Sequence, residues 1–199
     1  MCTKPVTFLN PKYRTLSFQP QLDKQYLSVP CGTCEQCRLT KQNEYFVRAY
    51  YEYQSTIKDG GFSFFETLTY DPAHVPVHMG LKCFCKSDFQ NFMKRLRFNL
   101  SSAGVDVTNG KLRYLVVSEY GENKGQPHYH VIFNCHFMLD PDPKKNAEIF
   151  KKYLHDSWCN GLLDNEKDSA NHKVQNPITQ VINDLGLVKY VSKYVSSPP

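Results

Sequence analysis

Two short strings of residues carry the side chains best suited to chemistry in this sequence of 199 residues. His128 and His130 lie in a segment typical of a β-strand, where alternate side chains share one face, so both imidazoles point the same way. Tyr190 and Tyr194 lie four residues apart in a segment typical of a helix, so both phenols share one face. Two metal-type ligands and two paired tyrosines predict an enzyme that cuts DNA and holds the cut end covalently.

The histidine pair gains a third candidate ligand if the strands around it form a hairpin. The strand-like segment 111–120 and the segment of the histidines flank a glycine-bounded turn. Pairing of Tyr120 with Pro127 would place Glu119 opposite His128, whereas a slip of one residue would turn Glu119 to the other face. Two imidazoles and one carboxylate could bind Zn²⁺, Fe²⁺, Mn²⁺ or Mg²⁺, and phosphate chemistry favours Mg²⁺ or Mn²⁺. Histidines held by ordinary hydrogen bonds are the alternative interpretation.

The tyrosine pair is ambiguous by itself, because aromatic residues at helical spacing are more often part of a core. Lys189 and Lys193 alternate with the two tyrosines and give them a cationic environment. A phenol with its ordinary pKa near 10 needs such help to act as a nucleophile, and Lys193 is a candidate for steadying the phenolate or the phosphate. Attack on a phosphodiester would give a phosphotyrosine that preserves the bond for rejoining, and two tyrosines would allow two sequential transfers.

Eight cysteines are present, and three of them, Cys31, Cys34 and Cys37, follow a C-x₂-C-x₂-C pattern. Since the first residues lack the apolar stretch of a signal peptide, we expect a reducing setting in which thiols bind a metal rather than form disulfides. Structural zinc requires four ligands, and Cys83 or Cys85 could supply the fourth from just before a predicted helix. Three reduced cysteines at the start of a helix are the alternative.

Hydrophobic periodicity predicts the elements that hold these residues in place. The expected helices cover 37–57, a segment beginning at Ser87, a segment beginning at Pro143 and the segment of the tyrosine pair. The expected strands cover 62–70, 111–120, 127–137 and, at an edge, 177–182. Ser87–Gln90 fits a capping box, and Asp142 fits an N-cap before a proline. Because the central pair is an antiparallel hairpin, we predict an α+β fold with helices packed on an antiparallel sheet.

The composition limits the function without choosing it. The net charge of +5, from 24 Lys and Arg against 19 Asp and Glu, is compatible with nucleic acid but only mildly favours it. No apolar run approaches the length of a membrane span, so no membrane partner is expected. A basic stripe is a candidate track for DNA phosphates or simply a solvated surface. It consists of Lys94, Arg95, Arg97, Lys111 and Arg113.

These residues resemble the motifs of the HUH endonuclease superfamily, and in particular those of the rolling-circle replication initiators of microviruses and their gokushovirus-like branch. Four stretches match in order, namely Cys31–Cys37, Phe65–Asp71, Ser118–His130 and Lys189–Tyr194. The resemblance implies a central antiparallel sheet of about five strands, similar to a split βαβ arrangement, with the tyrosine helix facing the metal histidines. It also implies nicking of a viral-strand origin, a 5′-phosphotyrosine link and a free 3′-hydroxyl that primes synthesis.

The resemblance assigns a role to each candidate residue. It makes His128, His130 and Glu119 the ligands of Mn²⁺ or Mg²⁺, and it makes Tyr190 and Tyr194 the nucleophiles. Structural Zn²⁺ on the three cysteines is a further candidate cofactor. The implied partners are single-stranded origin DNA together with a host helicase and polymerase, and the implied location is the cytoplasm of a host bacterium.

The expected organisation is an arm, cysteine segment and helix over 1–60, packed onto a nuclease core over 61–199 as one compact domain. The chain could be a piece of a longer protein. The alternative functions are a plasmid initiator, relaxase or transposase of the same superfamily, a non-catalytic zinc-stabilised DNA-binding module, and a metalloenzyme acting on small molecules.

Overall fold

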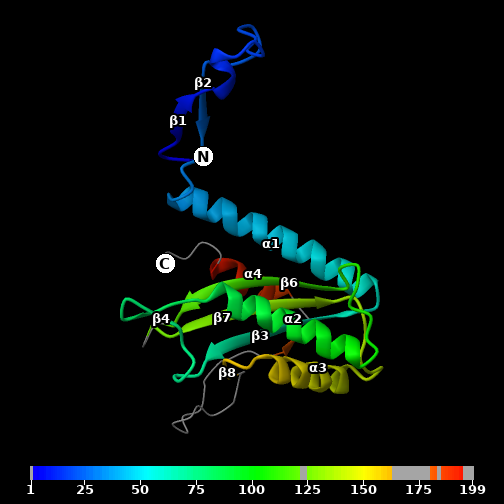
Figure 1. Cartoon of the computed structure of the whole chain (residues 1–199). Coiled ribbons are helices and arrows are strands. Elements are labelled where there is room, and N and C mark those ends of the chain that lie inside the picture. Colours follow the sequence, from blue (N-terminus) through cyan, green and yellow to red (C-terminus); the bar gives the residue numbers. More distant parts are fainter. Residues whose placement is uncertain (1, 122–124, 163–179, 183–184, 195–199) are drawn as a thin grey trace.

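An antiparallel sheet of five strands lies at the centre of the molecule (Figure 1). The structure is a computed structural model, and the residues it describes are 2–121, 125–162, 180–182 and 185–194. The strands in spatial order are β6 (Leu112–Tyr120), β7 (Pro127–Cys135), β3 (Phe62–Tyr70) and, both on the outer edge of β3, β8 (Gly161–Leu162) and β9 (Gln180–Val181). Every pair is antiparallel, which confirms the predicted α+β class with an antiparallel sheet.

The strand predictions differ from the structure mainly at their ends. The predicted strand 127–137 stops two residues early, at Cys135, because His136 turns away to bond the end of the first long helix. Within the predicted edge strand 177–182, Gln180–Val181 pairs with β3, and residues 177–179 lie outside the described residues.

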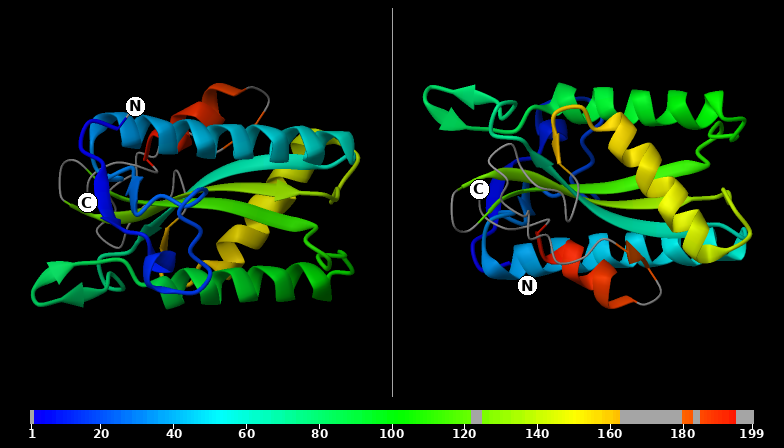
Figure 2. Two further views of the ribbon diagram at one scale, coloured as in Figure 1. Left: turned by 90° about the horizontal axis from the view of Figure 1, so that it is seen from above. Right: turned by 90° about the horizontal axis from the view of Figure 1, so that it is seen from below.

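Helices cover both faces of the sheet (Figure 2). On one face lie α1 (Glu35–Lys58) and α4 (Leu185–Tyr194), which contact each other as well as the sheet. On the other face lie α2 (Lys86–Ser102) and α3 (Pro143–Ser157). Two separate cores result, one on each face. The smaller core, on the α1 side, consists of Ala49, Phe65, Val117, Ile132, Ile182, Val188 and Val191.

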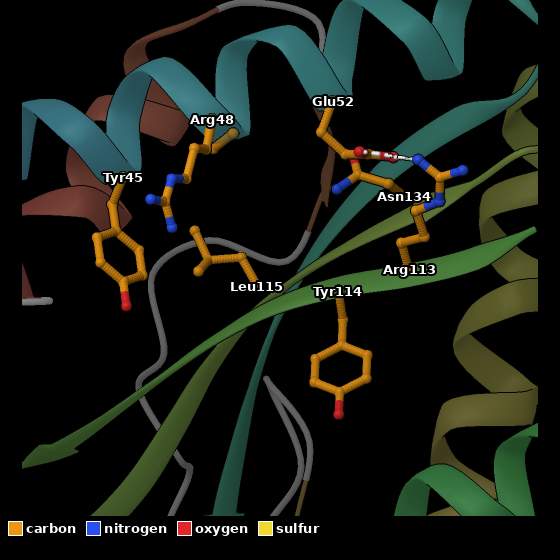
Figure 3. A pocket seen from close by; sticks show the side chains of 8 residues that line it. Tyr45, Arg48, Glu52, Arg113, Tyr114, Leu115 and Asn134 are labelled. Carbon is orange, nitrogen blue, oxygen red and sulfur yellow. Dashed lines mark hydrogen bonds and ion pairs between the residues drawn. The ribbon is translucent and has the colours of Figure 1, made fainter. Parts of the chain in front are cut away.

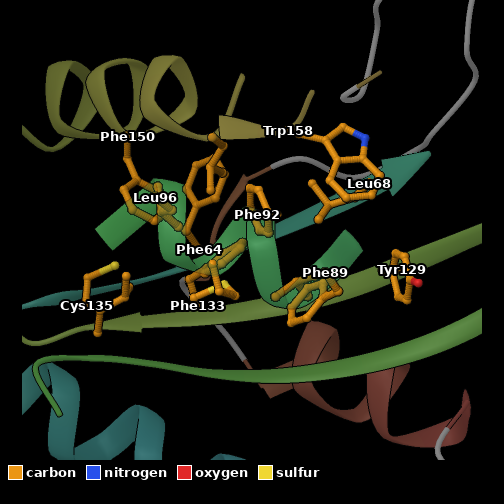
Figure 4. Packing of buried hydrophobic residues seen from close by; sticks show 14 of the residues in the cluster. Phe64, Leu68, Phe89, Phe92, Leu96, Tyr129, Phe133, Cys135, Phe150 and Trp158 are labelled. Carbon is orange, nitrogen blue, oxygen red and sulfur yellow. The ribbon is translucent and has the colours of Figure 1, made fainter. Parts of the chain in front are cut away.

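The larger core, between the sheet and α2 and α3, is dominated by aromatic rings (Figure 4). The ring of Phe150 on α3 lies 5.3 Å from that of Phe62, 5.4 Å from that of Phe64 and 5.5 Å from that of Phe133, all at steep angles. Such edge-to-face contacts are the favoured geometry for buried aromatic pairs. This core fixes β3 and β7, the two strands on which the candidate metal site depends.

The two predicted helix caps have opposite outcomes. Asp142 is the N-cap of α3, its side chain accepts from the backbone N–H of Lys144, and proline follows, as predicted. The Ser87 capping box is wrong, because α2 begins one residue earlier and Cys85 is its N-cap without a side-chain cap bond. The Ser87 hydroxyl instead lies 3.0 Å from the Cys85 thiol.

The N-terminal arm, residues 2–34, extends away from the sheet (Figure 1). It contains a separate hairpin of β1 (Val6–Leu9) and β2 (Tyr26–Val29), with a short 3₁₀ helix, Pro11–Arg14, after the first strand. The arm joins α1, which ends at Lys58. A second small hairpin, β4 (Val77–His78) and β5 (Leu81–Lys82), precedes α2. None of the helices in the described part of the chain has the length and apolar character needed to cross a membrane.

The predicted division between 1–60 and 61–199 falls in the turn that joins α1 to β3. Gly60 has a φ of +75°, the left-handed conformation with which many helices end and which glycine adopts without strain. The division into an arm with its helix and a core stays a prediction.

Candidate functional site

The hairpin of β6 and β7 has the predicted register. Tyr120 pairs with Pro127, and Glu119 pairs with His128. Side chains directly opposite each other share a face, so the carboxylate and both imidazoles lie on one side of the sheet. Ile132, two residues beyond His130 on the same strand, belongs to the core under α1 and α4. The three polar side chains therefore lie on the sheet face that these two helices cover.

One carboxylate oxygen joins the three candidate ligands. Oε2 of Glu119 lies 2.7 Å from Nε2 of His130 and 3.3 Å from Nε2 of His128. The imidazole rings are 4.8 Å apart between centroids, and the three ligand atoms lie within 4.8 Å of one another. The side chains are 7% exposed for His130, 15% for His128 and 21% for Glu119, so the cluster is sheltered but reachable from solvent.

Groups behind the cluster orient each imidazole. The backbone carbonyl of Gln126 lies 3.2 Å from Nδ1 of His128, and because a carbonyl can only accept, Nδ1 carries the proton and Nε2 keeps a lone pair. Nδ1 of His130 lies 3.0 Å from the hydroxyl oxygen of Thr67 on β3, and the ring of Phe65 stacks on this imidazole at 5.7 Å. Supporting contacts of this kind are typical of histidines that bind metals.

The electrostatics of the cluster suit a cation. Burial, and to a smaller extent the neighbouring His128, lowers the pKa of His130 to about 4, so its imidazole is neutral near pH 7. Two neutral imidazole lone pairs and a carboxylate then converge on one region. A divalent cation accepts all three donors, and nitrogen and oxygen ligands suit Mn²⁺, Mg²⁺, Zn²⁺ and Fe²⁺ alike. The residues fit a metal ion, and the donor set does not select which one.

The predicted tyrosines lie on α4, on the same sheet face as the cluster. Val188 and Val191 of this helix are buried against the sheet, and the helix contacts α1, β6 and β7. The backbone of Tyr190 and Tyr194 is part of α4, whereas their side chains lie outside the described part of the structure. The side chain of Lys193 is exposed, and its carbonyl accepts from Nε2 of Gln42 on α1 at 3.1 Å. Their catalytic roles stay predictions.

A cavity of about 330 Å³ lies between α1 and β6 (Figure 3). Tyr45 and Arg48 enter it from the helix, with the guanidinium 5.8 Å above the phenol ring. Arg113 and Leu115 line it from the strand, where Arg113 pairs with Glu52 at 3.1 Å. The cavity therefore offers an aromatic face, an apolar floor and positive charge, and it lies on the same face of β6 as Glu119.

The basic stripe predicted from the sequence is not a free phosphate track. Nε of Arg95 donates to the Ser157 carbonyl at 2.8 Å and joins α2 to α3. The guanidinium of Arg97 lies over the ring of Tyr114, and the Lys111 ammonium pairs with Asp106 at 2.6 Å. Intramolecular contacts thus occupy most of these cations. Sequence reasoning missed Arg48, whose signal was its helical position one turn from Tyr45.

The cysteine segment gathers four thiols rather than three. Cys31, Cys34 and Cys37 cluster as predicted, and the fourth thiol is Cys2. The suggestion of Cys83 or Cys85 is wrong. The Cys83 thiol donates to the Pro76 carbonyl, and the Cys85 thiol lies against Ser87 near the start of α2. Sequence reasoning missed Cys2 because only the β1–β2 hairpin brings it beside Cys31.

Thiols of the cysteine cluster have opposed acidities. Backbone N–H groups, first that of Thr3 and then that of Cys37, lower the pKa of Cys34 to about 5. Although the N–H of Gly32 opposes it, burial together with the neighbouring thiols raises the pKa of Cys37 to about 12. Thiolates packed this closely repel one another, since like charges in contact disfavour ionisation.

The fold and the cluster define an α+β protein with a candidate two-histidine, one-carboxylate metal centre on its sheet. The chain belongs to the replication-associated protein ORF2 family, whose profile matches residues 63–198. This membership confirms the resemblance to phage replication initiators found in the sequence.

Three relatives are replication-associated proteins of phages or viruses. The chain is 32% identical over 143 residues to VP4 of Bdellovibrio phage phiMH2K, which covers 68% of this chain and 42% of that protein. It is 30% identical over 158 residues to ORF2 of Spiroplasma virus 4 (77% and 46%), and 31% identical over 127 residues to ORF4 of Chlamydia phage 1 (63% and 27%). The matches span less than half of each relative. No solved structure matches the chain.

Proposed function

We propose that this chain is the nuclease part of a rolling-circle replication initiator of the HUH type. It would nick a single-stranded viral origin in a metal-dependent reaction, keep the 5′ end as a phosphotyrosine and later rejoin strands. The observation that carries the proposal is the meeting of Glu119 and both histidines on the sheet face that α4 covers. Membership in a family of replication-associated proteins supports it.

In the proposed reaction, the chain's own residues position the phosphate and supply the nucleophile. His128, His130 and Glu119 would hold Mn²⁺ or Mg²⁺, which when bound polarises the scissile phosphate as a Lewis acid. The hydroxyl of Tyr190 or Tyr194 attacks phosphorus, the bond to the 3′ oxygen breaks, and that oxygen leaves as a free 3′-hydroxyl after taking a proton. Lys193 would stabilise the phenolate or the phosphate. The second tyrosine would then serve the later transfer.

The cavity between α1 and β6 offers a place for the DNA strand beside the cleavage site. Its floor, Leu115, precedes Glu119 by four residues on β6, which corresponds to about 13 Å along a strand. A base could stack on Tyr45 while Arg48 pairs with a phosphate, as in proteins that bind single strands without base-specific readout. The origin sequence, the host helicase and the host polymerase stay predictions.

The test is formation of a covalent adduct. The chain is incubated with Mn²⁺ and labelled single-stranded oligonucleotides tiled across the replicon that encodes it, and denaturing gels report protein-linked label. We expect an adduct that EDTA prevents and that the double variant Tyr190→Phe/Tyr194→Phe lacks. Tyr51→Phe is the matched control, since this α1 tyrosine is 67% exposed. Undiminished adduct in the double variant would refute the tyrosine mechanism.

A non-catalytic, zinc-stabilised DNA-binding module is the second candidate, and the four-cysteine cluster is the observation that favours it. Such a protein would bind the origin oligonucleotide but form no adduct and release no 3′-hydroxyl with Mn²⁺. Plasmid initiators, relaxases and transposases of the same superfamily would form adducts, but on other DNA, so the sequence attached in the tiling experiment distinguishes them.

A further inference from the structure

The N-terminal arm carries a second metal site, separate from the cluster on the sheet. We propose that Cys2, Cys31, Cys34 and Cys37 bind one zinc ion as a tetrathiolate, and that this ion folds the arm and fastens it to the first turn of α1. Cys2 is the closing ligand. The proposal is independent of the DNA chemistry, and each of its measurements can be made without DNA.

The sulfur positions match a tetrahedron. Zinc binds thiolates at about 2.3 Å, so the sulfur atoms at the corners of a tetrahedral site are about 3.8 Å apart. The Sγ atom of Cys2 lies 3.6 Å from that of Cys31 and 3.9 Å from that of Cys34, and Cys31 lies 4.0 Å from Cys37. All four sulfur atoms lie within 4.8 Å of one another, and none is in a disulfide.

The backbone around the thiols supports negatively charged sulfur. The N–H of Cys31 donates to the Cys2 sulfur at 3.3 Å, and the N–H of Cys34 donates to the Cys31 sulfur at 3.4 Å. Gly32 makes the turn between these residues with a φ of +78°. Cys34 is the N-cap of α1, and Cys37 lies in its first turn, where the helix dipole favours negative charge.

The arm has no hydrophobic core that could fold it without a staple. Asn10 is the sole buried residue among residues 2–34. Its large apolar side chains are exposed, including Leu16, Leu22 and Tyr26, and its two strands pair only with each other. Segments this short gain too little from burial to offset the entropy of folding, and natural examples add disulfides or metals. Ligation of Cys2 by zinc would close the loop from Cys2 to Cys31.

The site also fixes the part of α1 that contacts the tyrosine helix. Gln42, five residues after Cys37, donates its side-chain amide to the carbonyl of Lys193 at 3.1 Å. Five residues of helix correspond to about 7.5 Å. The zinc would therefore hold the base of the arm within two helical turns of the end of α4.

The first test measures metal and ligand type on the full chain with a C-terminal tag. We expect one tightly bound zinc per chain that resists brief EDTA treatment. Cobalt exchanged into the site should show intense tetrahedral bands and thiolate charge-transfer absorption, which the histidine cluster cannot produce. Cys2→Ser should lose zinc at least tenfold faster to a chelator and weaken the charge-transfer band. Cys159→Ser, at an exposed cysteine outside the cluster, should behave as the wild type.

A second variant keeps the proposal testable if Cys2→Ser expresses poorly. Cys2→His should retain zinc and shift the cobalt bands to shorter wavelength, since one sulfur ligand becomes nitrogen. Trypsin should cut at Lys12, Arg14 or Lys24 within the arm at least tenfold faster once zinc is removed. Absence of zinc from the wild type, cobalt spectra unchanged by Cys2→Ser, or cleavage rates independent of zinc would each overturn the proposal.

Discussion

The hydroxyl of Thr67 on β3 lies 3.0 Å from Nδ1 of His130 on β7, and this contact fixes which ring nitrogen faces Glu119. Substitution of Thr67 by valine keeps the shape and removes the hydroxyl. We expect the affinity for Mn²⁺ to fall by about 10–100-fold, the usual cost of losing a group that orients a metal ligand. Calorimetric titration with Mn²⁺ measures it. Thr67→Ser, which keeps the hydroxyl, is the control, and equal affinities of valine and serine variants would contradict the prediction.

Without metal, the stability of the protein should fall as the pH drops from about 6.5 to about 4. Burial lowers the pKa of His130 to about 4 in the folded state, whereas an unfolded histidine titrates near 6.5. In this interval the unfolded chain binds a proton that the folded chain does not, so protonation favours unfolding by about 1–3 kcal/mol in total.

Urea unfolding in EDTA at pH 7.5 and pH 4.5 measures this effect. His130→Asn should reduce the loss of unfolding free energy between the two pH values, because the variant lacks the titrating group. His155→Asn, at a histidine side chain that is 61% exposed, should leave the loss unchanged. A loss as large in His130→Asn as in the wild type would show that other groups are responsible.

Substitutions in the cavity between α1 and β6 should weaken binding of single-stranded DNA without abolishing folding. Arg48→Ala should lower the affinity and reduce the salt dependence of binding by about one counterion, because one phosphate contact is lost. Tyr45→Ala should cost about 1–3 kcal/mol of binding free energy if a base stacks on the ring. Fluorescence anisotropy at several salt concentrations measures both.

Lys58→Ala provides the control for this cavity experiment, since it removes an exposed cation at the far end of the same helix. Unaltered affinity and salt dependence in both cavity variants, with normal adduct formation, would place the DNA elsewhere on the protein.

Phe150→Ala should destabilise the protein by about 3–5 kcal/mol, because this fully buried ring contacts three other phenylalanines and its loss leaves a cavity. The free energy of unfolding in urea measures the change. Phe98→Ala, on α2 with 72% of the residue exposed, is the matched control and should change stability by less than about 0.5 kcal/mol. Equal effects of the two substitutions would mean that this core is loosely packed.

The parts of the site that follow from local patterns could be predicted from the sequence. Alternation along one strand and a short turn were enough to place Glu119 opposite His128. Thr67 could not be found in this way, since it precedes His130 by 63 residues and meets it only through the pairing of β3 with β7. Cys2 was missed for a similar reason, because the strands that bring it to Cys31 are short and lack an apolar period.

Predictions about surface charge were less successful, and the reason is tertiary. The sequence shows that Arg95 is basic and helical, but only the packing of α3 shows that its guanidinium serves the Ser157 carbonyl. In contrast, the α+β class followed from the hairpin alone, because an antiparallel central pair excludes a fully parallel sheet.

The register of the β6–β7 hairpin also limits how the length of this segment can vary. Side chains alternate with a period of two, so one residue inserted into either strand between Glu119 and His130 would turn a ligand toward α2 and α3, into the aromatic core. Residues inserted into the connection between Gly121 and Gln126 leave the pairing intact. Viable insertions and deletions should therefore accumulate in that connection, and a library of length variants would separate a tolerant turn from two intolerant strands.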